Sequence, residues 1–492
     1  MDRHTAAPGT AGPDALADGG LSRLDPPAAE TTGFLAAVSS LVADTLAERA
    51  DRDVTGHPRG DALIAELLAD RPGPGPASVT ATLDRVRAVL ATGDDNAAPG
   101  ELGYIPGSGL VASAAADLIA GVANRYTGLS TFTPAAVALE QSVLSWLTEL
   151  FGLPDTAQAV LLSGGSAANL TAVVTARDAL VPAGEVGRAC LYVGAHAHAS
   201  VRKAAHIAGL HPDHVRLCAT SDGLRLDPGA VEVAIKQDLA DGLLPVAVVA
   251  AAGTTNTGVV DPLAALADVA AAAGVWLHVD AAYGGFFQLT DRGRRQLEGI
   301  DRADSITLDP HKSLFLPFGT GALLVRDRAH LAASFAEDAD YLRDTATEPW
   351  SLPDLGSLSP ELTRPWRGLR LWLPLTLHGT DAFVAALDRA LDLAGWAAGE
   401  LAADADVEVV SAPQLSILTF RVPGDDAAQD RALARINADH HLRLSSTVLE
   451  GRVVLRLAVL SHRTTPATLA RAVTRIGDAA AAARRELAAS AG

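Results

Sequence analysis

The sequence has little lysine, cysteine or aromatic side chain, and acidic residues far outnumber basic ones. Only three of its 39 basic residues are lysines, Lys203, Lys236 and Lys312, so arginine supplies almost every cation. The formal net charge of −19 at pH 7 makes nucleic acid and anionic membranes poor partners. No apolar run approaches the roughly 20 residues that a membrane-spanning helix needs. These absences indicate a globular protein in which a lysine next to apolar residues calls for an explanation.

The two cysteines, Cys190 and Cys218, each lie at one end of an apolar run that is typical of a strand. We expect buried free thiols rather than a disulfide, which fits a reducing cytoplasm. The amino terminus begins Met-Asp-Arg-His and lacks the apolar core of a signal peptide. These features predict a cytoplasmic location.

Hydrophobic periodicity and breaker residues predict four parts along the 492-residue chain. Residues 1–30 are rich in Ala, Gly, Pro and Asp and are predicted to be disordered. Residues 31–102 have helical spacing and form a predicted N-terminal helical arm. Residues 103–363 alternate strands with helices, which predicts a large α/β domain with a mostly parallel sheet. Residues 364–492 are typical of a smaller α+β domain with strands at 416–421 and 453–459.

The large domain has seven predicted strands, and helical stretches separate most of them. Active sites of parallel sheets lie at the carboxyl ends of the strands, so chemistry should appear in the sequence just after each strand. The predicted strands are residues 157–162, 190–193, 215–218, 245–251, 275–280, 305–308 and 321–325.

The first of these strands leads into Ser-Gly-Gly-Ser-Ala-Ala-Asn at residues 163–169, which opens a helix. Glycines allow a tight turn, and the free amides of a helix start bind phosphate, with Gly165 and Ser166 as the predicted contacts. An ordinary serine-capped helix after a glycine turn would look the same. The pattern matches neither the dinucleotide fingerprint nor the Walker A loop.

A histidine, a threonine loop and a carboxylate follow later strands. His198 begins a helix, where its ring could stack on a cofactor, act as an acid or base, or simply cap the helix. Zinc at His196 and His198 is disfavoured because no Asp, Glu or Cys lies at ligand spacing, and no metal site is predicted. Thr255 lies in a small polar loop that could bind a ligand or could equally be a connecting turn. Asp280 ends a very apolar strand and needs a partner, either a backbone amide or a protonated ring nitrogen.

The sixth strand leads into Asp309-Pro-His-Lys312, followed by several large apolar residues. A lysine in dry surroundings loses its charge more easily, and its neutral amine is a nucleophile. The alternative is a lysine at a loop edge whose ammonium reaches water. A phosphate cradle, a stacking ring, a carboxylate and a reactive amine thus follow strands of one sheet. Those four features are what holding pyridoxal 5'-phosphate (PLP) requires.

These motifs resemble those of the group II PLP-dependent amino acid decarboxylases, which include aromatic amino acid, glutamate, histidine and diaminobutyrate decarboxylases. The resemblance covers nearly the whole chain after about residue 30 and implies the fold-type I fold of the aspartate aminotransferase-like superfamily. It also implies a homodimer with shared active sites and an amino acid as the small-molecule substrate. The matching segments are residues 133–140, 163–169, 197–201, 253–255, 278–283, 309–312, 364–372, 444–447 and 455–458.

By this resemblance, Lys312 bonds covalently to the cofactor aldehyde and Asp280 keeps the pyridine nitrogen protonated. His198 stacks on one ring face and Ala282 packs on the other. The reaction implied is decarboxylation of an L-amino acid to its amine and CO2. The remaining residues implied in cofactor binding are Gly165, Ser166, Thr255 and His311.

The chain departs from the family pattern in two places. A mobile loop usually supplies a tyrosine that protonates the substrate carbon, but residues 342–363 contain none, and Tyr341 matches a position before that loop. The proton donor is then His198, Lys312 or a water, and an aldehyde product of oxidative deamination stays open. Asp309 stands where some relatives have a phosphate-contacting Asn. We expect its carboxylate to turn away from the phosphate.

The substrate side of the site is predicted at Tyr104, Ile105 and Phe132, which lie in or before segment 126–132. This region has fewer large rings than aromatic amino acid decarboxylases carry, so a branched or small apolar substrate is plausible and an aromatic one remains so. Two other readings stay open. One is an aminotransferase or lyase on the same fold, and the other is a binding protein without activity.

Overall fold

The computed structural model describes residues 24–49, 52–71, 73–105, 107–221, 224–336 and 351–490. The chain divides into two compact units, one with residues up to 52 and 56–94, the other with residues 53–55 and 95 onward. Among the residues described, no helix is both long and apolar enough to cross a bilayer.

The first unit holds the three helices that the sequence predicts for the arm, α1 (Ala28–Glu48), α2 (Asp61–Ala69) and α3 (Val79–Leu90). Ser78 caps α3 by accepting the Ala81 N–H at 3.3 Å, and Arg87 of α3 pairs with Asp44 of α1 at 3.2 Å. The predicted tail of residues 1–30 lies mostly outside the described residues, and its last three form the first turn of α1.

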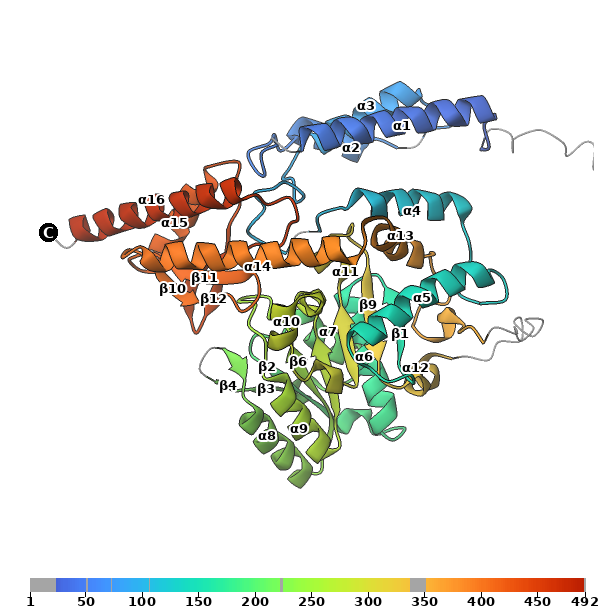
Figure 1. Cartoon of the computed structure of the whole chain (residues 1–492), viewed down its shortest axis with the longest axis vertical. Helices are drawn as coiled ribbons and strands as arrows, with labels where there is room; N and C mark the ends of the chain where they lie inside the picture. The colour runs from blue at the N-terminus through green and yellow to red at the C-terminus, as the bar shows by residue number, and fades with distance from the viewer. Residues whose placement is uncertain are drawn as a thin grey trace, which may run out of the picture. The chain divides into compact units, whose positions relative to one another are not determined.

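A seven-stranded sheet forms the centre of the second unit (Figure 1). Its order is β1-β9-β8-β7-β6-β2-β3, and only β9 runs antiparallel to its neighbours. All seven predicted strands are present, and the mostly parallel sheet is confirmed. The strands are β1 (Gln158–Leu162), β2 (Ala189–Gly194), β3 (Val215–Cys218), β6 (Leu244–Ala251), β7 (Trp276–Asp280), β8 (Ser305–Leu308) and β9 (Gly321–Val325).

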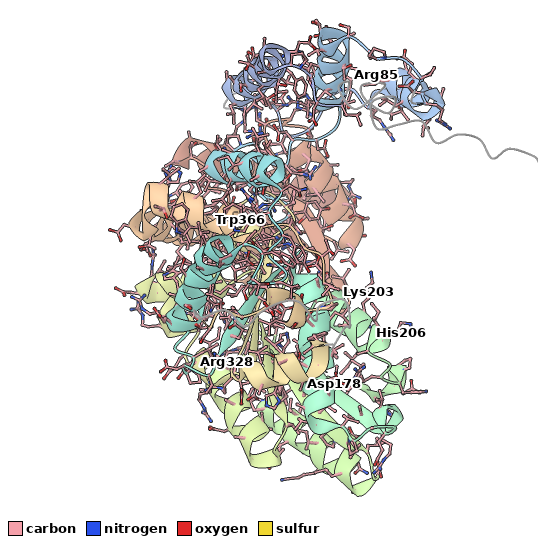
Figure 2. All side chains as sticks on the ribbon, turned by 90° about the vertical axis from the view of Figure 1, so that its right-hand side faces the viewer. Arg85, Asp178, Lys203, His206, Arg328 and Trp366 are labelled. Carbon is pink, nitrogen blue, oxygen red and sulfur yellow. The ribbon has the colours of Figure 1, made fainter. Side chains whose placement is uncertain are left out.

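Helices cover this sheet and build one continuous apolar core with it. Helix α6 packs against five of the strands, including β1, β8 and β9, whereas α8 and α9 pack against β6 and its neighbours. Helix α7 buries Ala204 and Ala205 and turns Lys203 and His206 to solvent (Figure 2). The helices are α4 (Val111–Ala123), α5 (Pro134–Leu150), α6 (Gly165–Leu180), α7 (Ala199–Ile207), α8 (Pro228–Ala240), α9 (Leu263–Ala273), α10 (Asp291–Gln296), α11 (Pro310–Ser313) and α12 (Arg328–Phe335), with a small hairpin of β4 (Thr220–Ser221) and β5 (Arg225–Leu226).

The carboxyl-terminal part has its own core and an antiparallel sheet of order β10-β11-β13-β12. The two strands predicted here appear as β11 (Ile417–Arg421) and β13 (Arg452–Ala458). Two further strands, β10 (Glu408–Ser411) and β12 (Ser445–Leu449), were not predicted, because these edge strands are partly exposed and lack a continuous apolar run. The helices are α13 (Gly368–His378), α14 (Thr380–Ala403), α15 (Asp426–Asn437) and α16 (Pro466–Ser490).

Candidate active site

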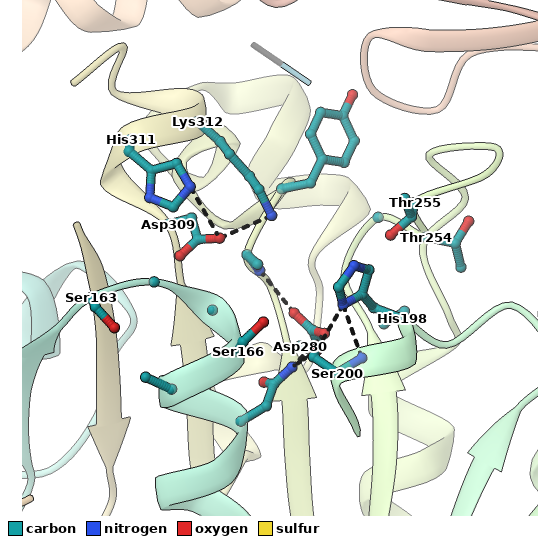
Figure 3. A pocket seen from close by; sticks show the side chains of 18 residues that line it. Ser163, Ser166, His198, Ser200, Thr254, Thr255, Asp280, Asp309, His311 and Lys312 are labelled. Atoms are coloured by element: carbon teal, nitrogen blue, oxygen red, sulfur yellow. Dashed lines mark hydrogen bonds and ion pairs between the residues drawn. The ribbon is translucent and has the colours of Figure 1, made fainter. Parts of the chain in front are cut away.

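One cavity of about 300 Å³ opens at the carboxyl ends of the strands (Figure 3). It gathers side chains that follow β1, β2, β6, β7 and β8, as expected for a parallel sheet. All eight residues predicted to bind a cofactor line it: Gly165, Ser166, His198, Thr255, Asp280, Ala282, His311 and Lys312.

The cradle at one end of the cavity is built from backbone. After β1 the chain turns at Gly164, whose φ of +155° favours glycine, and α6 begins at Gly165 with no side chain capping it. A Cβ on Gly165 would lie 2.9 Å from Asp309 Oδ2, and one on Gly321 would lie 2.5 Å from the Gly164 Cα. Only glycines permit this close packing, which leaves the uncapped start of a 16-residue helix facing the cavity. Such a helix start binds anions.

Lys312 projects from α11 into the cavity and pairs with Asp309, with 2.9 Å between Nζ and Oδ2. Its side chain is one-quarter exposed, whereas Leu314, Phe315 and Leu316 are buried in the core. Phe315 has a φ of +64°, which turns the chain after α11 away from the site. The apolar residues that follow Lys312 in the sequence therefore do not surround its amine, which lies among mostly polar cavity residues.

Asp309 does not turn away from the cradle as expected. It is buried, it lines the cavity, and its Oδ2 lies beside Gly165. His311 Nδ1 donates to the Thr320 carbonyl at 2.6 Å, and its Nε2 lies 3.7 Å from Asp309 Oδ2. Burial lowers the pKa of His311, and the Asp309 carboxylate opposes that shift.

Asp280 ends β7 at the bottom of the cavity and receives two N–H donors. Asn169 Nδ2 donates to its Oδ2 at 3.0 Å, and the Ala282 amide donates to its Oδ1 at 3.2 Å. The backbone-amide partner that the sequence left open is thus present, and the same carboxylate faces the cavity, where a ring nitrogen could reach it.

His198 caps α7, because its Nδ1 accepts the Ser200 amide at 3.2 Å, and the ring also borders the cavity (Figure 3). Capping and a cofactor-facing position are therefore compatible. Thr255, which also lines the cavity, is exposed, while Thr254 is buried and bonded to Thr257 at 2.8 Å. Among the described residues, no group of three or more His, Cys, Asp or Glu could hold a metal.

The three residues predicted for the substrate side do not line this cavity within one chain. Tyr104 is 59% exposed and Phe132 is 62% exposed, while Ile105 packs partly against the core. Tyr341 and residues 342–350 lie outside the described residues. The described remainder of the predicted loop, residues 351–363, has no tyrosine.

Three polar residues were not predicted as part of the site: Asn169 and Ser200, which line the cavity, and His278, which lies buried behind Asn169. Asn169 lies one turn after Gly165 on α6, so the helical period alone directs it to the same side as the cradle. His278 precedes Asp280 by two residues, and alternation along β7 puts both on one face. These spacings were the available signal.

The site fits PLP on its own geometry. An uncapped helix start offers amides for the phosphate, a carboxylate at the floor can face the ring nitrogen, and one lysine amine reaches into the same cavity. The donor set contains no competing metal cluster among the described residues.

Comparisons with known proteins point the same way. The family model described as "Pyridoxal-dependent decarboxylase conserved domain" matches residues 77–423. An aromatic-L-amino-acid decarboxylase of Bacillus atrophaeus is 35% identical over 375 residues, 75% of this chain and 78% of the relative. An L-2,4-diaminobutyrate decarboxylase of Rhizobium meliloti is 36% identical over 377 residues, 75% of each chain.

Two further similarities bear on the product and the fold. A phenylacetaldehyde synthase of Arabidopsis thaliana is 30% identical over 418 residues, 80% of this chain and 85% of the relative. The crystal structure of Oryza sativa TDC with PLP and tryptamine matches with a TM-score of 0.87 and 28% identity, covering 92% of this chain and 98% of that one.

Proposed function

Because the chain belongs to the pyridoxal-dependent decarboxylase family, we propose that it converts an L-amino acid to its amine and CO2 with PLP as cofactor. The observation that carries this proposal is one cavity in which Lys312, Asp280 and the uncapped start of α6 face the same space. When bound, PLP supplies an aldehyde for the substrate amine and a ring that accepts the electrons left by CO2.

The protein's own residues supply binding, orientation and charge. The amides at Gly165 and Ser166 hold the phosphate, and Lys312 provides the amine that fixes the cofactor aldehyde. Asp280, oriented by its two N–H donors, holds a proton on the ring nitrogen. That fixed charge lowers the barrier to losing CO2, because it lies where charge develops. Ala282 and His198 lie on the two sides of the space that the cofactor ring would occupy.

We propose a substrate with an aromatic or branched apolar side chain. Two exposed aromatic residues, Tyr104 and Phe132, do not line the cavity of their own chain, which fits a pocket completed by a second subunit. Incubation with pooled L-amino acids, followed by mass spectrometry of CO2, amine and aldehyde, tests the reaction and the substrate together. Turnover of acidic amino acids alone would overturn the substrate proposal, and PLP binding without CO2 would favour an aminotransferase or lyase.

An aldehyde product is the second candidate function. It is favoured by the absence of tyrosine from residues 342–363 and by the similarity to a phenylacetaldehyde synthase. In that reaction O2 and water are consumed, and CO2, ammonia and hydrogen peroxide accompany the aldehyde. The same incubation distinguishes the two functions, because mass spectrometry detects the amine and the aldehyde separately. Only the aldehyde route depends on O2.

We further propose a cytoplasmic homodimer. Helix α4 exposes Leu118 and Ile119 at 52% and Val122 at 76%, and neighbouring exposed apolar side chains of this kind mark protein–protein contact sites. The two cysteines are buried and unpaired, which suits a reducing compartment. Size-exclusion chromatography with light scattering should give twice the 50.5 kDa chain mass. A monomer at working concentration would contradict the proposal.

A further inference from the structure

A line of hydrogen bonds runs from the buried side of β7 to the cavity wall at α7. Trp276 Nε1 donates to Ser305 Oγ at 2.7 Å, and the same oxygen lies 2.8 Å from His278 Nδ1. His278 Nε2 then lies 3.1 Å from Asn169 Oδ1. The line joins residues of β7, β8 and α6 that the proposed reaction has not yet used.

On the far side of Asn169 the line divides. Its amide nitrogen is 3.0 Å from Asp280 Oδ2 and 2.9 Å from Ser200 Oγ, and Ser200 Oγ is 2.7 Å from His198 Nδ1. Figure 3 shows the Asp280, Ser200 and His198 part of this arrangement. One amide side chain therefore connects the residue beneath the ring nitrogen with the residue beside the ring.

The charge of Asp280 sets the direction of every bond in the line. A carboxylate only accepts, so the Asn169 group facing it must be NH2, and the Asn169 carbonyl must face His278. A carbonyl also only accepts, so His278 Nε2 carries a hydrogen. The opposite orientation of Asn169 would bring two acceptors together at Asp280.

His278 is neutral in the folded protein, because complete burial lowers its pKa to about 4 despite the nearby Asp280 charge. With its hydrogen on Nε2, its Nδ1 accepts from the Ser305 hydroxyl, which in turn accepts from Trp276. Every donor in this half of the line thus has an acceptor, as a buried polar network requires.

The other half fixes His198 in the same way. Ser200 Oγ accepts the second Asn169 hydrogen, so the Ser200 hydroxyl hydrogen is free to point at His198 Nδ1. The Ser200 backbone amide also donates to Nδ1, at 3.2 Å. A nitrogen that accepts two donors carries no hydrogen, so the hydrogen of neutral His198 is on Nε2.

We propose that Asn169 and His278 are positioning residues, which orient Asp280 for the ring nitrogen and hold His198 as the Nε2–H tautomer. This inference rests on the proposed PLP site but not on the identity of the substrate or product. It gives His198 a defined part: a neutral N–H donor beside the ring rather than a general base.

The test compares two substitutions of one residue. The amide nitrogen of Gln can occupy the place of His Nε2, whereas that of Asn can reach only the place of Nδ1. We expect His278→Gln to bind PLP within about threefold of the wild type, and His278→Asn to bind roughly tenfold or more weakly, because one buried acceptor loses its donor. PLP dissociation constants come from titration of the cofactor-free full chain, with His206→Gln as an exposed control.

A purely structural role predicts a different pattern. Equal loss of PLP affinity in His278→Gln and His278→Asn, in step with equal loss of melting temperature, would overturn the proposal. Nitrogen-15 NMR of histidine-labelled, cofactor-free protein tests it without altering the network, using His198→Gln to identify the His198 signals. We expect a protonated Nε2 and an unprotonated Nδ1, and the reverse tautomer would refute the inference. Both measurements stand even if no decarboxylation is found.

Discussion

A fully buried ion pair between Glu140 of α5 and Arg364, which precedes α13, braces the strand that leads into the cradle. Both side chains are 0% exposed, and Arg364 also donates to the Leu161 carbonyl at 3.3 Å. Leu161 belongs to β1, the strand that leads into the cradle. Glu140 in addition accepts the Gly368 amide at 3.0 Å. Replacing Glu140 by Ala would leave the Arg364 guanidinium buried without a countercharge.

The expected loss is large for one residue. Removing one partner of a buried pair costs about 3–5 kcal/mol, because the other charge stays desolvated. With about 2.1 cal/mol/K of unfolding entropy per residue, a chain of this length loses roughly 1 °C of melting temperature per kcal/mol, if it unfolds cooperatively. Glu140→Ala should therefore melt about 3–5 °C lower. It should also bind PLP more weakly, because β1 and Gly165 lose their brace.

The assay is thermal unfolding of the cofactor-free and PLP-saturated protein, followed by circular dichroism. Glu149→Ala, on the exposed face of the same helix, is the matched control and should shift the melting temperature by less than about 1 °C. The double variant Glu140→Leu/Arg364→Met should recover most of the loss, since no charge stays buried alone. If Glu140→Ala matches the control, the reasoning about the brace fails.

Three further outcomes are expected. Lys312→Ala should abolish both turnover and the visible absorbance of lysine-bound cofactor. The control Lys236→Ala, which removes an exposed ion pair with Glu232, should change neither. An absorbance band retained in Lys312→Ala would refute the role of Lys312. Asp309→Asn should bind PLP roughly tenfold more tightly, because a carboxylate beside the phosphate cradle is removed, and weaker binding on titration would contradict this. Burial lowers the pKa of His278 to about 4 in the folded protein. Between about pH 6.5 and pH 4, therefore, the unfolded chain binds a proton at His278 and the folded protein does not. Its stabilisation is present above pH 6.5, and about 3 kcal/mol is lost as the pH falls toward 4. Denaturant titrations should show a slope of stability with pH that is shallower in His278→Gln than in the wild type, and equal slopes would contradict this.

The sheet could be predicted because its strands are buried on both faces and appear as continuous apolar runs, such as β6 and β9. The rule that chemistry follows the strands then located Lys312 and Asp280. The surroundings of Lys312 could not be predicted, because they depend on the turn at Phe315, which sends its sequence neighbours into the core. The positions of Tyr104 and Phe132 relative to the cavity likewise depend on tertiary packing that no local pattern records.

The scarcity of lysine gains a physical meaning in the folded protein. Lys203 and Lys236 are exposed on helices, so among the described residues Lys312 is the only lysine whose amine reaches the cavity. Asp309 holds that amine at 2.9 Å and also stands beside the cradle. A phosphate held in the cradle would repel the Asp309 charge, and covalent use of the Lys312 amine would alter the ion pair that balances this charge. On the proposed function we therefore expect Asp309, as well as Lys312, to influence the affinity for PLP.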